Sequence, residues 1–195
     1  MALSEAGGPL ADAVAPVGYA VRGGPLAQDL YQYKSDRVDP ATAARAAARL
    51  AGSLRGFLAE QGPALWRAAG MLAGPAAAAV VPSGQGRQGM HPLADIVQSC
   101  TGLPVVRLSV RPAEVHARGV NARWVRVASP VAGADVLVVD DTWVSGGSAQ
   151  SVAAALKRSG ARRVAIVVLG RHVNPADPRA GKFLAALPPA GIRPP

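Results

Sequence analysis

Residues 136–148 read VLVVDDTWVSGGS, and this stretch decides the fold that the sequence predicts. Its first four residues are apolar without alternation, a pattern typical of a strand buried on both faces of a parallel sheet. Asp140 and Asp141 follow directly and would be poorly placed in a core, so we expect them to face a cleft. The segment 142–148, rich in glycine and hydroxyl groups, then leads into a predicted helix. The stretch therefore predicts a strand, a loop and a helix with a polar site at the strand's carboxyl end.

Further apolar runs and helical patterns surround this unit. Asp39 is the expected N-cap of a long helix that should end near Gly62, and Gly160 should close the last helix. Strand and helix alternate along the chain, which predicts an α/β fold with a doubly wound, mainly parallel sheet. We expect an edge strand or extended segment at 14–21, strands at 76–81, 103–108, 136–139 and 164–169, and helices at 25–34, 41–60, 91–101 and 148–159.

The chain has 195 residues, which is enough for one domain with its own core. We expect a mobile N-terminal segment over 1–24, a domain over 25–174, and an irregular, proline-rich tail over 175–195. Within the domain, residues 25–72 would form a small helical hood or cap and residues 76–174 the α/β core.

The composition narrows the class of protein. Cys100 is the single cysteine, which excludes a disulfide framework and a multi-cysteine zinc ribbon. No apolar run reaches the ~18 residues of a membrane span, and the N-terminus lacks the pattern of a secretory signal. We therefore expect a soluble, cytoplasmic protein with no membrane partner.

The formal net charge of +9 has three explanations. Nucleic-acid binding is one, and recognition of phosphate groups at a specific site is another, because arginine grips phosphate bidentately. The third is an arginine-rich composition, since only three of the 21 basic residues are lysines. The basic residues are scattered without a block of like charges, so the charge alone does not decide.

The glycines and hydroxyls of 142–148 suit an anion. Gly146 and Gly147, with serines on either side, would stand at a helix N-terminus, where backbone N–H groups and the helix dipole favour phosphate. Beside that phosphate, Asp140 and Asp141 could accept hydrogen bonds from vicinal hydroxyls and hold Mg²⁺ through water. Carboxylates beside a phosphate cradle therefore predict a sugar phosphate as the ligand.

Other phosphate motifs fit less well. A nucleoside-triphosphate P-loop needs a lysine that 142–148 lacks. Gly84, Gly86 and Gly89 match a dinucleotide fingerprint after a strand, but Arg107 stands where an acidic residue is expected about 20 positions later. A sugar-phosphate hydrolase is also disfavoured, because no nucleophile or general base is evident.

At this point a family resemblance becomes visible. VLVVDDTWVSGGS closely resembles the phosphoribosyl pyrophosphate signature of the type I phosphoribosyltransferases, and the similarity extends over about residues 20–173. LYQYK at 30–34 and RGVN at 118–121 resemble segments of the ComF-like or amidophosphoribosyltransferase-like branch. AVVPSGQG at 79–86 lies where these proteins place their pyrophosphate loop. The chain departs from relatives in lacking a cysteine zinc module and in having Ala2, not cysteine, after the first methionine.

The resemblance implies a fold of the type I phosphoribosyltransferase kind and a pentosyltransferase activity. Such an enzyme binds phosphoribosyl pyrophosphate and Mg²⁺ and transfers the phosphoribosyl group to a nitrogen acceptor, releasing pyrophosphate. Asp140 and Asp141 would be the catalytic residues on the ribose hydroxyls, and would hold the metal through water. The 5′-phosphate loop would comprise Thr142, Ser145, Gly146, Gly147 and Ser148. The pyrophosphate loop would comprise Ser83, Gly84, Gln85, Gly86 and Arg87.

The resemblance also implies a flap and an acceptor side. The polar region 109–126 would close over the pyrophosphate, with Arg118 as its contact, although Arg118 could equally be a solvated loop residue. Trp143, Arg171 and His172 are the candidates on the acceptor side. Trp143 could stack on a base or pack under the loop, and a strand-end histidine is more often structural.

The acceptor itself stays open. Val144 stands where purine-salvage relatives have an acid, which disfavours hypoxanthine and guanine because valine transfers no proton. A second hypothesis is a non-catalytic sensor of phosphoribosyl pyrophosphate or nucleotides, or a ComF-like protein associated with DNA uptake. A nucleic-acid partner is less favoured than a small molecule, and a homodimer is left open.

Overall fold

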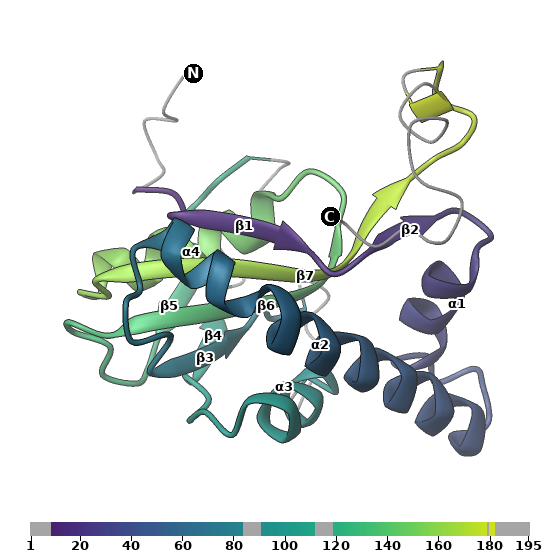
Figure 1. The fold of residues 1–195 in the computed structure, drawn as a ribbon, viewed down its shortest axis with the longest axis horizontal. Coiled ribbons are helices and arrows are strands. Elements are labelled where there is room, and N and C mark those ends of the chain that lie inside the picture. Colours follow the sequence, from purple (N-terminus) through teal and green to yellow (C-terminus); the bar gives the residue numbers. More distant parts are fainter. Residues whose placement is uncertain (1–8, 84–90, 112–118, 179, 182–195) are drawn as a thin grey trace.

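The described part of the chain comprises residues 9–83, 91–111, 119–178 and 180–181 of a computed structural model. It contains a sheet with helices on both sides (Figure 1). The strands are β1 (Ala13–Pro16), β2 (Tyr19–Val21), β3 (Ala77–Val80), β4 (Leu108–Val110), β5 (Val125–Val127), β6 (Asp135–Trp143) and β7 (Arg163–Val173). The helices are α1 (Pro25–Gln32), α2 (Pro40–Ala69), α3 (Leu93–Thr101) and α4 (Gly147–Arg158).

Within these residues the central sheet is parallel throughout. Its strand order is β1-β7-β6-β3. β2 follows β1 along the same edge of the sheet and pairs with a later part of β7. β4 and β5 form a separate antiparallel pair. The expected α/β class with a mainly parallel sheet is confirmed, and so is the edge strand predicted over 14–21, which the structure divides into β1 and β2.

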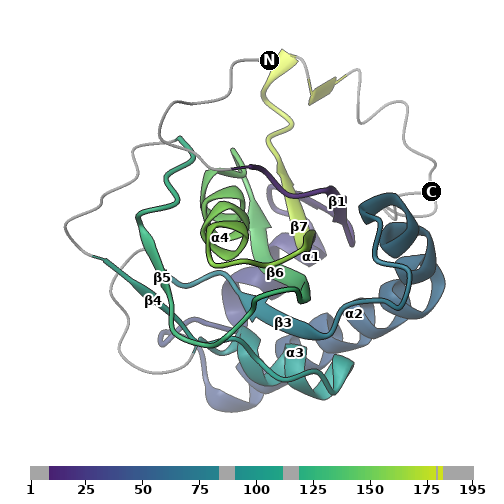
Figure 2. The same cartoon turned by 90° about the vertical axis from the view of Figure 1, so that its left-hand side faces the viewer.

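Two helical layers cover the sheet, as Figure 2 shows from one end of the strands. Leu137 and Val139 of β6 pack in a core with α1, α2 and α3. Val136 and Val138, which alternate with them along the strand, pack on the other face with α4. Alternate side chains of one strand thus enter two cores, which explains the unbroken apolar run and confirms the doubly wound arrangement.

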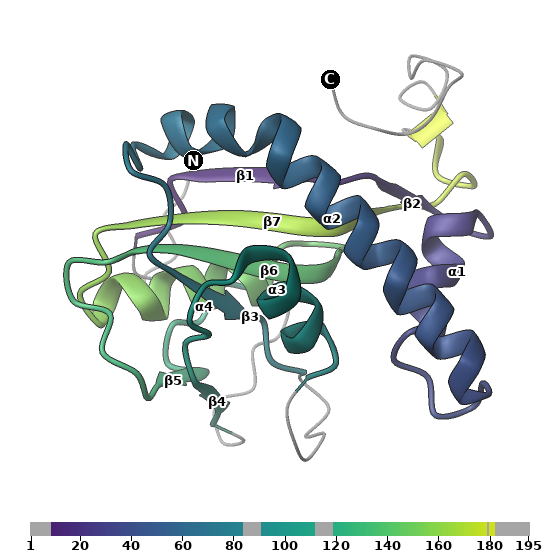
Figure 3. The ribbon, with the colours of Figure 1, turned by 60° about the horizontal axis from the view of Figure 1, so that its bottom comes forward.

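The long helix α2 runs along β1 and β7 (Figure 3). Asp39 caps it as predicted, because its Oδ1 accepts a 2.9 Å hydrogen bond from the backbone N–H of Thr42. The predicted end near Gly62 is wrong, since the helix continues through Pro63 to Ala69. Leu65 and Ala69 remain buried, and this burial offsets the backbone hydrogen bond lost at the proline.

Three other boundaries differ from the predictions. β6 extends past Val139 to Trp143, so both aspartates belong to the strand. β7 extends to Val173, because its last residues pair with β2. The strand predicted over 103–108 is corrected to a single bridge between Val105 and Ala78, after which the chain turns away into β4.

Some expectations fall partly or wholly outside the described residues. These include most of the predicted tail, over 182–195, and the first eight residues of the N-terminal segment. In the part of the chain that is described, no helix combines the length and the apolar character needed to cross a membrane.

Candidate functional site

The two adjacent aspartates lie near the carboxyl end of β6, and each is only 9% exposed. Val139 packs on the α1 face and Val138 on the α4 face, so alternation along the strand directs Asp141 toward α1 and Asp140 toward the other face. The carboxylates are therefore neighbours in sequence with different surroundings.

Asp141 is held by two residues from the end of α1. The Tyr33 hydroxyl donates to its Oδ2 at 2.6 Å, and the Lys34 ammonium donates to the same oxygen at 2.5 Å. Burial opposes ionisation, but the charge of Lys34 and the two hydrogen bonds outweigh it and hold the pKa of Asp141 below its ordinary value. Asp141 is therefore an anion at neutral pH.

Asp140 has the opposite character. Burial, and then the negative charge of Asp141, raise the pKa of Asp140 to about 7. Its Oδ1 accepts a 2.9 Å hydrogen bond from the backbone N–H of Asp141, which opposes the rise only in part. One carboxyl of the pair is thus ionised while the other titrates near neutrality, a difference that often marks functional sites.

The segment after β6 turns sharply into α4. Gly146 is the N-cap with a left-handed φ of 78°, and as a glycine it has no side chain that could cap the helix. The Ser145 hydroxyl accepts a long contact of 3.4 Å from the Gly147 N–H. The helix thus begins six positions after Asp141 with backbone N–H groups that its N-cap residue leaves available, and such groups can bind phosphate.

Trp143 explains why residue 146 is glycine. A Cβ built on Gly146 would lie 2.1 Å from Cζ2 of the Trp143 ring, which no side chain could tolerate. The indole also packs against the core on the α4 face. Of the two alternatives for Trp143, the geometry favours packing under the loop over stacking on a ligand.

The sheet register brings a third segment to this end. Val80 of β3 pairs with Val139, and the Val81 N–H donates to the Val139 carbonyl at 3.0 Å. Ser83 consequently leaves the sheet next to the strand end that carries the aspartates. The other expected members of the pyrophosphate loop, and the flap contact, lie outside the described residues; these are Gly84, Gln85, Gly86, Arg87 and Arg118.

The candidate acceptor residues Arg171 and His172 do not follow the last strand, as the sequence suggested. Both lie within β7, where Arg171 pairs with Tyr19 of β2 on one side and with Trp143 of β6 on the other. The added strand β2 extends pairing along β7 and causes this difference. Both side chains are exposed.

Sequence reasoning missed Tyr33 and Lys34 as site residues. Their segment, LYQYK, had served only as a point of resemblance. A tyrosine and a lysine next to each other at a predicted helix end could have indicated a polar site. Their partner Asp141, however, lies 108 residues from Tyr33 and 107 residues from Lys34 in the sequence. His91 also lies nearby, with its ring centroid 6.4 Å from that of Tyr33.

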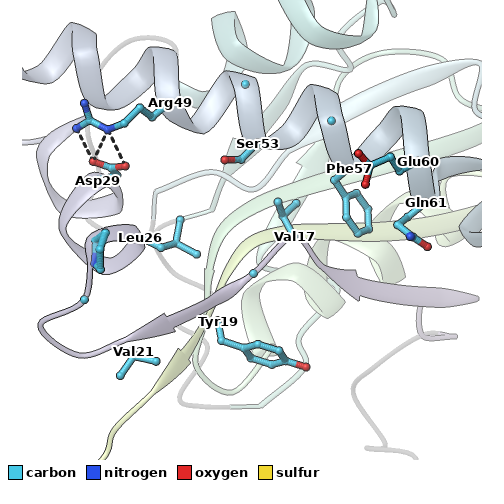
Figure 4. Close-up of a pocket in the computed structure, with 15 residues that line it drawn as sticks. Val17, Tyr19, Val21, Leu26, Asp29, Arg49, Ser53, Phe57, Glu60 and Gln61 are labelled. Atoms are coloured by element: carbon cyan, nitrogen blue, oxygen red, sulfur yellow. Dashed lines mark hydrogen bonds and ion pairs between the residues drawn. The ribbon is translucent and has the colours of Figure 1, made fainter. Parts of the chain in front are cut away.

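A groove lies apart from the candidate site. It has a volume of about 620 Å³ and runs between α1, α2 and the edge formed by β1 and β2 (Figure 4). Arg49 of α2 spans one end and forms a bidentate pair with Asp29 of α1 at 2.6 to 3.1 Å. None of the predicted site residues that the structure describes lines this groove.

No protein-family model and no curated protein matches the chain. Several solved structures are similar to it. A phosphoribosyltransferase from Corynebacterium diphtheriae is 26% identical over 83% of this chain and 86% of that chain, with a TM-score of 0.39. The orotate phosphoribosyltransferase of Mycobacterium tuberculosis H37Rv, in complex with phosphoribosyl diphosphate, is 20% identical over 76% and 86%, with a TM-score of 0.39.

The adenine phosphoribosyltransferase of Leishmania tarentolae is 15% identical over 90% of this chain and 87% of that chain, with a TM-score of 0.46. These three similar structures are all phosphoribosyltransferases. With TM-scores below 0.5, these likenesses are distant.

Proposed function

We propose that this chain is a phosphoribosyltransferase that binds phosphoribosyl pyrophosphate and Mg²⁺ and transfers the phosphoribosyl group to a nitrogen acceptor, releasing pyrophosphate. One observation carries the proposal. Four residues separate the buried pair Asp140 and Asp141 from Gly146, which opens the N-terminal turn of α4, so acceptors for sugar hydroxyls are followed closely in sequence by donors for phosphate.

The phosphate end of the ligand would meet α4. In the proposal its 5′-phosphate accepts hydrogen bonds from the backbone N–H groups at the start of the helix and from the hydroxyls of Thr142, Ser145 and Ser148. Gly146 forms a left-handed turn at the start of α4, and the close approach of Trp143 restricts that turn. A preformed cradle of this kind binds phosphate without an entropic cost of ordering the loop.

The ribose end would meet the aspartates. Tyr33 and Lys34 both bind Oδ2 of Asp141, so in the proposal its Oδ1 accepts from a ribose hydroxyl. Asp140 supplies the second contact, as an acceptor when ionised and as a donor when protonated. Lys34 places a positive charge beside Asp141, and this charge would attract a ligand that has phosphate groups at both ends.

The residues fit a Mg²⁺ ion that is held mainly by the ligand. Within the described residues no group of three or more histidine, cysteine or carboxylate side chains could hold a metal. Asp140 and Asp141 offer carboxylate oxygens, and one or two such groups with substrate phosphates are the usual Mg²⁺ donors. When bound, Mg²⁺ would neutralise charge on the leaving pyrophosphate.

The remaining assignments complete the proposal. Ser83 begins the pyrophosphate loop, which Gly84, Gln85, Gly86 and Arg87 continue, and Arg118 contributes from the flap. Arg171 and His172 face solvent on β7, beside Trp143 in register, and are proposed for the acceptor side. Val144 is 75% exposed and offers no proton, which favours an acceptor that needs no acid there.

Two measurements test the proposal. Calorimetric titration with phosphoribosyl pyrophosphate and Mg²⁺ should show binding whose apparent affinity falls when pyrophosphate competes. A pyrophosphate-release assay against bases, amines and ammonia should then find an acceptor. Absence of binding contradicts the whole proposal, whereas binding without release from any acceptor contradicts catalysis and supports the sensor.

A further inference from the structure

A second concavity, separate from the candidate site, is lined by arginines. Arg111, Arg123, Arg126 and Arg158 line a pocket of about 380 Å³, the arginine pocket, which lies between the β4–β5 pair and the carboxyl end of α4. Its other lining residues among those the structure describes are Ala122, Val125, Val127, Ala155 and Ser159, and none of them is a carboxylate.

Charge pairing separates these arginines from several others. Within the part of the chain that the structure describes, three arginines pair with carboxylates across elements, and those pairs tie the fold together. They are Arg49–Asp29, Arg162–Asp135 and Arg163–Asp12. The arginine pocket contains none of these pairs. Its guanidinium groups gather against their mutual repulsion without a carboxylate partner among the described residues.

The helix dipole accounts for only one of the four arginines in the pocket. Arg158 stands in the last turn of α4, where a cation is favoured by the helix dipole. Arg111 and Arg126 belong to the β4–β5 region and Arg123 to the turn before β5, so no helix end explains them. A hydrogen bond of 2.8 Å from the Asn121 N–H to the Ser151 hydroxyl joins this region to α4 and keeps the lining in place.

The arginine pocket is distinct from the phosphate cradle. It lies toward the carboxyl end of α4, whereas the cradle lies at the amino end of this twelve-residue helix. At a rise of about 1.5 Å per residue, the two ends of the helix are on the order of 16 Å apart. One phosphoribosyl ligand in the cradle therefore does not explain the arginine pocket.

We propose that the arginine pocket binds a compact ligand carrying several linked phosphate groups, such as the oligophosphate chain of a nucleotide. Four guanidinium groups match the charge of an oligophosphate and can bind its oxygens in bidentate pairs. The concave shape favours such a compact anion over the extended backbone of a nucleic acid, which would follow a stripe of charge along the surface. The inference concerns an anion other than the phosphoribosyl ligand, and three of the four arginines lie in the segment 109–126 that the sequence predicts as the flap.

The test uses inorganic tripolyphosphate as the probe. The variant R123Q/R126Q/R158Q removes three charges from the arginine pocket, and R45Q/R55Q/R67Q removes three exposed charges from α2 as a matched control. Each protein is titrated calorimetrically at physiological ionic strength, and thermal unfolding verifies that all three fold. Tripolyphosphate can also enter the cradle, but both variants retain the cradle, so their difference reports on the arginine pocket alone.

The pocket variant should bind tripolyphosphate at least about tenfold more weakly than wild type, and the control should stay within about twofold. Equal losses in the two variants would show general attraction to a basic protein and overturn the proposal. A short DNA duplex that displaces tripolyphosphate from wild type at a lower phosphate concentration would overturn it too, in favour of nucleic acid.

Discussion

The hydroxyl of Tyr33 donates a 2.6 Å hydrogen bond to Asp141, and this contact joins the end of α1 to the end of β6 across 108 residues of sequence. Lys34 binds the same carboxylate oxygen from the next position in the chain. The N-terminal helices therefore help to set the ionisation of the candidate site as well as covering one face of the sheet.

Replacing Lys34 should expose the cost of burying Asp141. Folding lowers the pKa of Asp141. Its contribution to stability is therefore present at pH values above the ordinary carboxyl pKa and is lost as the pH falls through the folded-state pKa. Because Lys34 is 36% exposed and screened, K34Q should lower the unfolding free energy by about 1 to 2 kcal/mol at pH 7. The difference from wild type should close below about pH 4.

Urea unfolding of K34Q and of R55Q, which removes an exposed charge from α2, measures this effect. Equal stabilities for the two variants across the pH range would show that the Lys34–Asp141 contact does not govern the buried carboxylate.

Asp140 should impose the opposite pH dependence. Its raised pKa contributes stability that is fully present below the ordinary carboxyl value and is lost as pH rises through about 7. D140N removes the titrating group, so wild type should lose stability relative to D140N between about pH 4 and pH 7, by at most about 1.4 kcal/mol per pH unit. Urea unfolding over this range checks it, with D95N on α3 as control. A difference between wild type and D140N that does not vary with pH would refute it.

Alanine at position 146 should disrupt the loop through Trp143. G146A places a Cβ 2.1 Å from the indole in a left-handed backbone, and should cost about 2 to 4 kcal/mol of unfolding free energy. G133A is the matched control, because Gly133 has a similar φ of 72° but no atom within 4 Å of its Cβ position. Its cost should be about 1 kcal/mol.

The clash itself is isolated by a double-mutant cycle with W143A, read by thermal or urea unfolding. In the W143A background the penalty for G146A should shrink to the size seen for G133A. If G146A costs as much stability in the W143A background as in wild type, the cost comes from the backbone conformation alone and not from the contact with Trp143.

The sequence predicted those parts of the molecule that depend on local pattern. The apolar run before Asp140 predicted a buried parallel strand, and Asp39 predicted the start of α2, because each signal lies within a few residues. The ends of elements were less predictable. β7 is long because β2 pairs with it, and α2 passes Pro63 because its next turns stay buried, and both causes are tertiary.

The same limit applies to the candidate site. The acidic pair and the glycine-rich loop could be recognised in one short stretch of sequence. The hydrogen-bond partners of Asp141, Tyr33 and Lys34, come from the end of α1, far away in the sequence. The unequal pKa values of two adjacent aspartates also follow from their surroundings, since the sequence presents them as equivalent. The packing of Trp143 on Gly146 became clear only from the course of the turn.

The most direct test titrates phosphoribosyl pyrophosphate with Mg²⁺ into wild type, D140N/D141N and the control D36N/D95N, which removes two carboxylates elsewhere. Two lost hydrogen bonds to charged groups should weaken binding to D140N/D141N by at least about a hundredfold, while the control should stay within about twofold of wild type. Unchanged affinity in a folded D140N/D141N protein would contradict the assignment of the ribose site to these aspartates.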